Sequence, residues 1–371
     1  MINLALMDFL FVLLSILIIT LLIVVHEFGH FLAAKFYGFQ TPIFGIGMPF
    51  GPYIEICKKW GTRFRFYFLL IGGFVAIPET HDETSEETLK DLDDLKPFRK
   101  FPVLPRAIVA VAGVAFNVIF AFLLAVVMAM SIGLPKIVPS TVIKGFTSEN
   151  SAAKIAGLEA GDKILSINGI AIDTGIEMQS KIAEFKDQDI QIKVANKDEI
   201  FSVHSEGVIG VQLGYEKEYI KSENIFSAIF SGLKFTVNAT VMMIFSVFAI
   251  LASLLAKVLS VFGLHLDFAT ASLGDVKGIV GIVQLITEDI KHNLWMTLEF
   301  AFLLSLNLAV INLLPIPALD GGHLLFLGYE AIFKKKPSTK LQDGLVQGGF
   351  ILLLSLMAIT TINDIRSFFA K

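Results

Sequence analysis

The sequence predicts a polytopic α-helical membrane protein of about four transmembrane helices, with a membrane-inserted β-hairpin region and one β-rich domain outside the membrane. Three observations support this fold class. The 371 residues are 54% hydrophobic and only 17% charged, whereas soluble domains are about a quarter charged. Apolar segments long enough to cross a bilayer recur along the chain. A single long stretch between them, about 134–219, has the composition and alternation of a soluble β-rich domain.

Composition also narrows the function. The formal net charge of -4 gives no case for nucleic-acid binding. Cys57 is the one cysteine, so neither an intrachain disulfide nor a multi-cysteine zinc site is available.

The first predicted span covers residues 9–34. No basic segment precedes it, and the first lysine is Lys35, so it does not have the form of a cleaved signal peptide. Positive charge gathers only after the span. The positive-inside rule therefore predicts that the N-terminus is extracytoplasmic and that the end of this helix lies at the cytoplasmic side.

Near that end stands the motif His26-Glu27-Phe28-Gly29-His30. Two histidines four residues apart share one face of a helix, and both imidazoles can bind one Zn²⁺. Glu27 then lies close enough to act on a water bound there. A chance match is the alternative explanation, but ionisable residues are costly in a membrane span and usually functional. The sequence therefore predicts a metal site at His26 and His30, with Glu27 as its catalytic base.

Residues 38–80 are apolar and rich in glycine and proline. Two short strands are expected here, Phe64–Tyr67 and Phe74–Ile77, on either side of Gly72-Gly73. They would form a β-hairpin that dips into the membrane from the cytoplasmic side. Strand edges cannot face lipid, so this hairpin either receives an extended substrate by strand addition or caps the helices.

An acidic, solvated segment at 79–100 leads to the second predicted span, about 104–132, which runs outward. This span contains Gly113 and Asn117, one helical turn apart. A buried asparagine in a span either bonds a neighbouring helix or helps to hold an active site.

The soluble stretch resembles a PDZ domain. A short helix at 151–156 ends at a glycine, and a strand at 164–167 runs into an Asn-Gly turn. Alternating runs follow at 190–194 and 200–203. PDZ domains commonly take peptide tails by strand addition, and a purely steric role as a filter is equally compatible with the sequence.

Residues 225–262 are long enough to span, but topology favours a membrane-surface or re-entrant helix. The third span is expected at about 294–314, followed by the basic cluster Lys334–Lys336, which should be cytoplasmic. A crossing at 225–262 would put those lysines outside. A fourth span, about 345–362, returns the chain outward. The predicted domains are therefore 1–133, 134–220, 221–290 and 291–371.

The third span ends in a run broken by Pro315 and Pro317 and followed by Asp320-Gly321-Gly322. Such breaks are tolerated at membrane depth only where the backbone lines an enclosed site. The topology brings Asp320 to the same side as His26 and His30, so it is the candidate third ligand of a catalytic zinc site, with a helix cap as the alternative role.

Two further polar residues lie near this acid. Asn312 is placed to donate hydrogen bonds to a substrate backbone or an oxyanion. His323 is a competing nitrogen ligand that we interpret as a supporting or structural residue.

Taken together, the His-Glu-Phe-Gly-His run, the run N-L-L-P-I-P-A-L-D-G-G-H that begins at Asn312, and the PDZ-like insert resemble the site-2 protease family of intramembrane zinc metalloproteases, most closely its bacterial RseP type. The resemblance implies zinc ligands at His26, His30 and Asp320, with Glu27 as the catalytic base. It also implies substrate contacts at Asn312 and at the hairpin, whose candidate residues are Gly72, Gly73 and Phe74. Asn117 and His323 would support the site.

For function, the resemblance implies cleavage of single-span membrane proteins in or near their spanning segments, with anti-sigma factors or remnant signal peptides as substrate types. It implies a multi-pass protein of the bacterial cytoplasmic membrane, with the PDZ-like domain extracytoplasmic and the active site near the cytoplasmic side. Two alternatives stay open. A zinc-binding transporter would use intramembrane His and Asp as a pathway. A PDZ-bearing scaffold would hold a structural zinc in a closed four-ligand site.

Overall fold

The computed structural model describes residues 2–70, 72–78, 98–148, 150–195, 197, 199–261, 282–283, 286–287 and 294–369. The predicted acidic loop up to residue 97, and residues 262–281 of the predicted membrane-surface segment, lie outside this set. The chain divides into two compact units, Met1–Met130 with Glu223–Lys371, and Ser131–Ser222. Each unit is described by itself.

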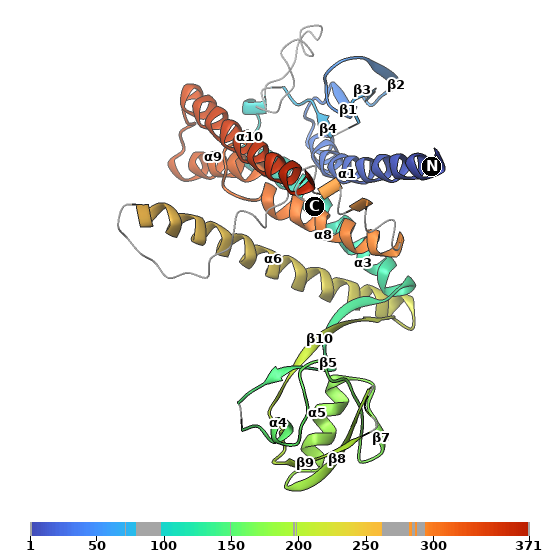
Figure 1. Cartoon of the computed structure of the whole chain (residues 1–371). Coiled ribbons are helices and arrows are strands. Elements are labelled where there is room, and N and C mark those ends of the chain that lie inside the picture. The colour runs from blue at the N-terminus through green and yellow to red at the C-terminus, as the bar shows by residue number, and fades with distance from the viewer. Residues whose placement is uncertain are drawn as a thin grey trace. The chain divides into compact units, whose positions relative to one another are not determined.

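The first unit is built on long apolar helices (Figure 1). They are α1 (Ile2–Phe36), α3 (Val103–Ser131), α6 (Ile225–Val261) and α10 (Thr339–Phe369). Each contains an apolar stretch of 24 to 29 residues, enough to cross a membrane. The prediction of a polytopic helical membrane protein is confirmed.

Two shorter helices complete this unit, α8 (Leu294–Asn312) and α9 (Asp320–Phe333). The predicted third span corresponds to α8, which is shorter than the four long helices. By contrast, the segment predicted to lie in the interface is one continuous helix, α6, long and apolar enough to span. α6 packs on α8, where the rings of Phe235 and Phe302 stack with centroids 5.0 Å apart. The interfacial placement of 225–262 stays a prediction.

Between α1 and α3 the chain forms a four-stranded sheet and a short 3-10 turn, η1 (Phe98–Lys100). The strands are β1 (Ile43–Ile46), β2 (Tyr53–Lys59), β3 (Thr62–Tyr67) and β4 (Gly73–Val75), in the order β2-β3-β1-β4.

The predicted hairpin between Phe64–Tyr67 and Phe74–Ile77 is wrong in its pairing. Both strands exist, as β3 and β4, but β1 lies between them, parallel to β3 and antiparallel to β4. Gly45 of β1 explains part of this arrangement, because a Cβ there would lie 2.2 Å from the ring of Phe74. A short strand that needs a glycine gives little signal of its own.

The sheet packs on α1 through aromatic side chains. Phe31 of α1 is fully buried, and its ring centroid lies 5.5 Å from that of Phe44 and 5.7 Å from that of Phe64. β4, the outermost strand on that side, lies beside α1 (Figure 1). This packing positions a strand edge along the helix that carries His26 and His30.

The second unit contains two sheets and two short helices. Its elements are β5 (Leu134–Phe146), α4 (Ala152–Ile155), β6 (Ile164–Ile167), β7 (Ile170–Ala171), α5 (Gly175–Glu184), β8 (Gln188–Val194), β9 (Ile200–Ser205) and β10 (Val211–Ile220). One sheet has the order β7-β6-β8-β9, and β5 pairs with β10 in the other.

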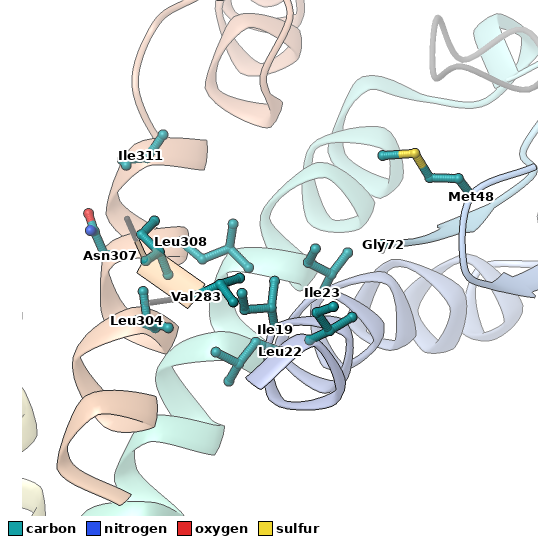
Figure 2. Close-up of a pocket in the computed structure, with 12 residues that line it drawn as sticks. Ile19, Leu22, Ile23, Met48, Gly72, Val283, Leu304, Asn307, Leu308 and Ile311 are labelled. Atoms are coloured by element: carbon teal, nitrogen blue, oxygen red, sulfur yellow. The ribbon is translucent and has the colours of Figure 1, made fainter. Parts of the chain in front are cut away.

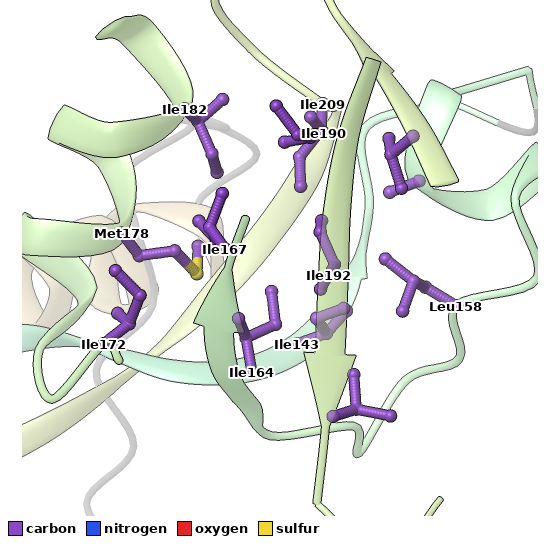
Figure 3. Packing of buried hydrophobic residues seen from close by; sticks show 13 residues of the cluster. Ile143, Leu158, Ile164, Ile167, Ile172, Met178, Ile182, Ile190, Ile192 and Ile209 are labelled. Atoms are coloured by element: carbon purple, nitrogen blue, oxygen red, sulfur yellow. The ribbon is translucent and has the colours of Figure 1, made fainter. Parts of the chain in front are cut away.

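Isoleucines dominate the core of this unit (Figure 3), where Met178 and Ile182 of α5 face the buried side chains of β6 and β8. The predicted Asn-Gly turn joins β6 to β7, and both turn residues have positive φ, 50° at Asn168 and 77° at Gly169. A capping box at Thr174 and Glu177 begins α5. Local turn and capping residues therefore explain why the β6–β7 turn and the start of α5 lie where they do.

Candidate active site

The two histidines of the motif point the same way from α1 because they are one turn apart. Their Nε2 atoms lie 3.1 Å from each other, and both side chains are almost completely buried. Their rings meet edge to face, with centroids 4.7 Å apart. The helix alone therefore presents two nitrogen ligands to one point.

Asp320 completes the cluster from the other end of the chain. Its Oδ2 lies 3.1 Å from Nε2 of His26 and 3.4 Å from Nε2 of His30. Within the described part of the chain, these three residues form the one group of His, Cys, Asp and Glu arranged to hold a metal ion. The predicted alternative ligand, His323, is not part of it.

The glycines after Asp320 explain how the acid reaches the histidines. α8 ends at Asn312, a proline-containing turn follows, and α9 starts at Asp320. A Cβ on Gly321 would lie 2.2 Å from the carbonyl oxygen of Leu314, and one on Gly322 would lie 2.3 Å from that of Ile316. The turn can fold back on the first turn of α9 only because both positions lack a side chain.

The donor set fits zinc. Nδ1 of His30 lies 2.7 Å from the carbonyl oxygen of Val109, so Nδ1 carries the hydrogen and Nε2 keeps its lone pair. The buried Oδ2 of Asp320 has no hydrogen-bond partner. Tetrahedral ligands about 2.0–2.2 Å from Zn²⁺ are about 3.3–3.5 Å apart, close to the 3.1–3.4 Å observed. Three lone-pair atoms at this separation suit a shared cation.

Gly113 keeps the space at this point open. It lies on α3 directly opposite the cluster, and a Cβ there would lie 2.4 Å from Nε2 of His30 and 2.8 Å from Nε2 of His26. Any side chain at residue 113 would therefore occupy the space beside the two Nε2 atoms, where a shared ion would be held. This is a second observation that the site is shaped to take an ion.

Asn117, one turn further along α3, supports His26. It is fully buried, and its amide nitrogen lies 3.1 Å from Nδ1 of His26. If Nε2 of His26 holds a metal, its Nδ1 carries the hydrogen. Rotating the Asn117 amide by 180° then places Oδ1, a buried atom with no hydrogen-bond partner in the present orientation, where it accepts that hydrogen. The hydroxyl of Ser305 in α8 donates a hydrogen bond of 2.8 Å to the backbone carbonyl of Asn117. Asn117, which contacts His26 of α1, is therefore also bonded to α8.

Glu27 reaches the sheet from α1. Its Oε2 accepts a hydrogen bond of 3.2 Å from the backbone N–H of Val75 in β4. Ala76 donates to Ile43 in β1, so the alternation of an antiparallel pair turns the N–H of Val75 to the opposite edge. Among the described strands β4 pairs only with β1, so the carboxylate of the motif is held at the other edge of β4.

The remaining predicted residues divide into two groups. The amide nitrogen of Asn312 lies 3.2 Å from Nε2 of His26, so this residue borders the cluster. Gly72 and Gly73 lead into β4. The side chain of Phe74, by contrast, packs against Tyr67 in the sheet, with centroids 5.6 Å apart. The predicted substrate contacts of Asn312, Gly72, Gly73 and Phe74 therefore stay predictions.

Comparison with known proteins agrees with this geometry. The model of peptidase family M50 matches residues 14–356. The chain belongs to this family. A protein of Nostoc sp. named "Putative zinc metalloprotease" is 33% identical over 366 residues, 95% of both chains. Membrane metalloprotease ARASP of Arabidopsis thaliana, named as chloroplastic, is 32% identical over 95% of this chain and 78% of its own length. A Campylobacter jejuni protein, also named "Putative zinc metalloprotease", is 32% identical over 95% of this chain and 92% of its own.

Membership in family M50 makes this protein a metalloprotease and Zn²⁺ its metal. The structure brings the three predicted ligands His26, His30 and Asp320 together, but sequence reasoning did not foresee three features that surround them. These are the absence of a side chain at Gly113, the carbonyl of Val109 and the N–H of Val75. Only the glycine has a sequence signal, its one-turn spacing from Asn117 in an apolar helix; backbone groups have none.

Proposed function

We propose that this M50 protease cleaves single-span membrane proteins in or near their spanning segment, with the substrate extended along the edge of β4 that faces away from β1. The hydrogen bond between the N–H of Val75 and Glu27 carries this proposal. A strand that added to that edge would run past the carboxylate and the histidine–aspartate cluster together.

In the proposed mechanism His26, His30 and Asp320 hold the zinc, which when bound activates a water and polarises the scissile carbonyl. Glu27 takes the proton of the attacking water and delivers it to the leaving amine. Asn312 donates its amide N–H to the substrate carbonyl that becomes negatively charged. A helical substrate hides its carbonyls in its own hydrogen bonds, so pairing with β4 also keeps the reacting segment unwound.

The proposed setting is the bacterial cytoplasmic membrane, with the active site near the cytoplasmic side. The absence of lysine and arginine before Lys35 supports an extracytoplasmic N-terminus. The proposed substrates have already been shortened on the outer side, as in anti-sigma factors or remnant signal peptides. Such substrates suit an enclosed site, because a substrate that still carried a bulky outer domain would not fit into it.

We also propose that the Ser131–Ser222 unit is a PDZ-like module that takes a peptide tail. A cavity of about 470 Å³ lies between α5 and β10, lined by Met178 and Ile182 on one side and Val211 and Leu213 on the other. In the described sheets β10 pairs only with β5. A peptide strand added to its other edge would have apolar side-chain contacts with α5.

Cleavage of a purified single-span model substrate tests the proposed protease function. Wild-type protein is compared with Glu27→Gln, and zinc content is measured in both. We expect cleavage by the wild type and none by Glu27→Gln, with equal zinc. The matched control is Glu216→Gln, the same change at an exposed position of β10, which should cleave normally. Equal zinc with no cleavage by any of the three proteins would favour a scaffold or transporter.

A further inference from the structure

We propose that an apolar cavity between α1 and α8 is the pocket that selects one large aliphatic or aromatic side chain of the substrate, close to the scissile bond. This inference rests on the proposed function and adds a specificity determinant to it. The cavity has a volume of about 310 Å³, which is enough for one large side chain.

Four parts of the first unit line this cavity (Figure 2). Ile19, Leu22 and Ile23 project from α1, and Leu304, Leu308 and Ile311 project from α8. Met48, from the turn after β1, and Gly72 close the side nearest the sheet. Val283 lies between the two helices. Among the described residues that line it, Asn307 alone has a polar side chain, so a charged substrate group would lose its hydration there without a charged partner from this part of the chain.

The cavity adjoins the metal cluster on two helices. Ile23 precedes His26 by three residues, so on α1 the cavity lies one turn, about 4.5 Å along the axis, from the first ligand. On α8, Ile311 is followed directly by Asn312, whose amide lies 3.2 Å from His26. The lining therefore continues into the polar site on both sides.

The cavity also adjoins the strand edge. Gly72 immediately precedes β4, and Gly73 is two residues, about 7 Å, from Val75, whose N–H meets Glu27. A substrate strand paired with this edge therefore brings residues within about two positions of its reacting bond past the cavity. The extended backbone stays at β4 while a side chain enters between α1 and α8.

The sheet-side wall has a defined shape. The N–H of Gly47 donates to the carbonyl of Gly72 at 2.9 Å, and the N–H of Met48 donates to that of Leu69 at 3.0 Å. These bonds hold the unbranched Met48 side chain over the cavity (Figure 2), where it can adapt to occupants of different shape. Gly72 has a φ of 107°, a backbone conformation that residues with a side chain rarely adopt, so this wall depends on a glycine.

The chemistry of the lining decides the occupant. Spanning segments are rich in leucine, isoleucine, valine and phenylalanine, and such side chains gain from close contact in a preformed apolar cavity. Alanine and serine would leave it unfilled, and lysine or aspartate would be buried without a partner. We therefore expect a preference for leucine, phenylalanine or methionine at one substrate position.

A substrate series tests this inference. In a single-span model substrate, each residue around the cleaved bond is changed in turn to alanine, leucine, phenylalanine or lysine, and kcat/KM is measured. At one position within about two residues of the bond, leucine and phenylalanine should exceed alanine by about tenfold or more, and lysine should abolish cleavage. A flat series would overturn the pocket while leaving the protease function intact. Failure of wild type to cleave any member would overturn both.

Two enzyme variants assign the preference to this cavity. Leu304→Trp places a larger side chain in it, so the ratio of kcat/KM for the leucine substrate to that for the alanine substrate should fall by about tenfold. Leu303→Trp makes the same change one residue earlier, at an exposed position that does not line the cavity, and should keep the preference. Equal slowing of all substrates by Leu304→Trp, or the same effect from both variants, would refute the assignment.

Discussion

Replacing Gly113 with alanine tests the central geometric argument, that the space in front of the histidines belongs to the metal. The added Cβ would stand 2.4 Å from Nε2 of His30, whereas ordinary contact begins at 3.4 Å. The shortfall is about 1 Å. Metal sites tolerate deviations of only about 0.2 Å in ligand distance, so the two imidazoles cannot move by this amount and still hold one ion.

We therefore expect Gly113→Ala to bind zinc at least about 100-fold more weakly and to lose proteolytic activity. Alanine is a better helix former than glycine by about 1 kcal/mol, so α3 itself should not be weakened. Zinc content after dialysis at a series of buffered free-zinc concentrations measures the effect. Circular dichroism checks that the helices remain.

The matched control is Gly328→Ala, the same change on α9 at a position with no atom within 4 Å of the new Cβ. This variant should keep its zinc and its activity. If Gly113→Ala binds zinc as tightly as the wild type and cleaves substrate, the space opposite the histidines is not the metal position and the reasoning is wrong.

Three further predictions concern the surroundings of this site. Asp320→Asn should lower zinc affinity by about tenfold or more and lose activity, measured by zinc content; unchanged zinc and activity would exclude the carboxylate as a ligand. Val75→Pro removes the N–H that bonds Glu27, the proposed catalytic base, but no bond to β1, so kcat should fall about tenfold or more with zinc retained. Ala76→Pro breaks the bond to Ile43 of β1 and should lower the melting temperature. Wild-type kcat in Val75→Pro would contradict the role of this edge. Arg106→Met leaves the partly buried Glu330 without its partner, 2.7 Å away in the wild type, and should destabilise the fold by about 3 kcal/mol. Thermal unfolding of this variant and of the double variant with Glu330→Leu measures this effect, and the double variant should recover most of the loss.

Local chemistry accounts for what the sequence could predict. The four-residue spacing of His26 and His30 sets their geometry, because any α-helix places such residues on one face. The Asn168-Gly169 turn forms as predicted because both residues tolerate positive φ. The long apolar runs become helices because a chain in lipid must satisfy its backbone hydrogen bonds internally.

The sheet was beyond such reasoning. Strands β3 and β4 could be expected at 64–67 and 74–77, but their partner could not, since β1 is four residues long and contains Gly45. Its place in the sheet depends on the ring of Phe74, which lies where a Cβ of residue 45 would be. The choice of partner strand is set by contacts between residues distant in sequence, and the pattern of residues within one short strand does not reveal those contacts.

By itself, then, the sequence determined the motif, the apolar helices and the candidate residues of the site. The tertiary structure decided that Asp320, nearly 300 residues beyond His26, meets it at 3.1 Å, that Gly113 of α3 leaves the space before both histidines open, and that the edge of β4 meets Glu27. The physical reason is range. Helix periodicity and turn preferences act between neighbours in the chain, whereas a metal site needs atoms from three helices and a strand edge placed to within tenths of an ångström, which only their mutual packing can achieve.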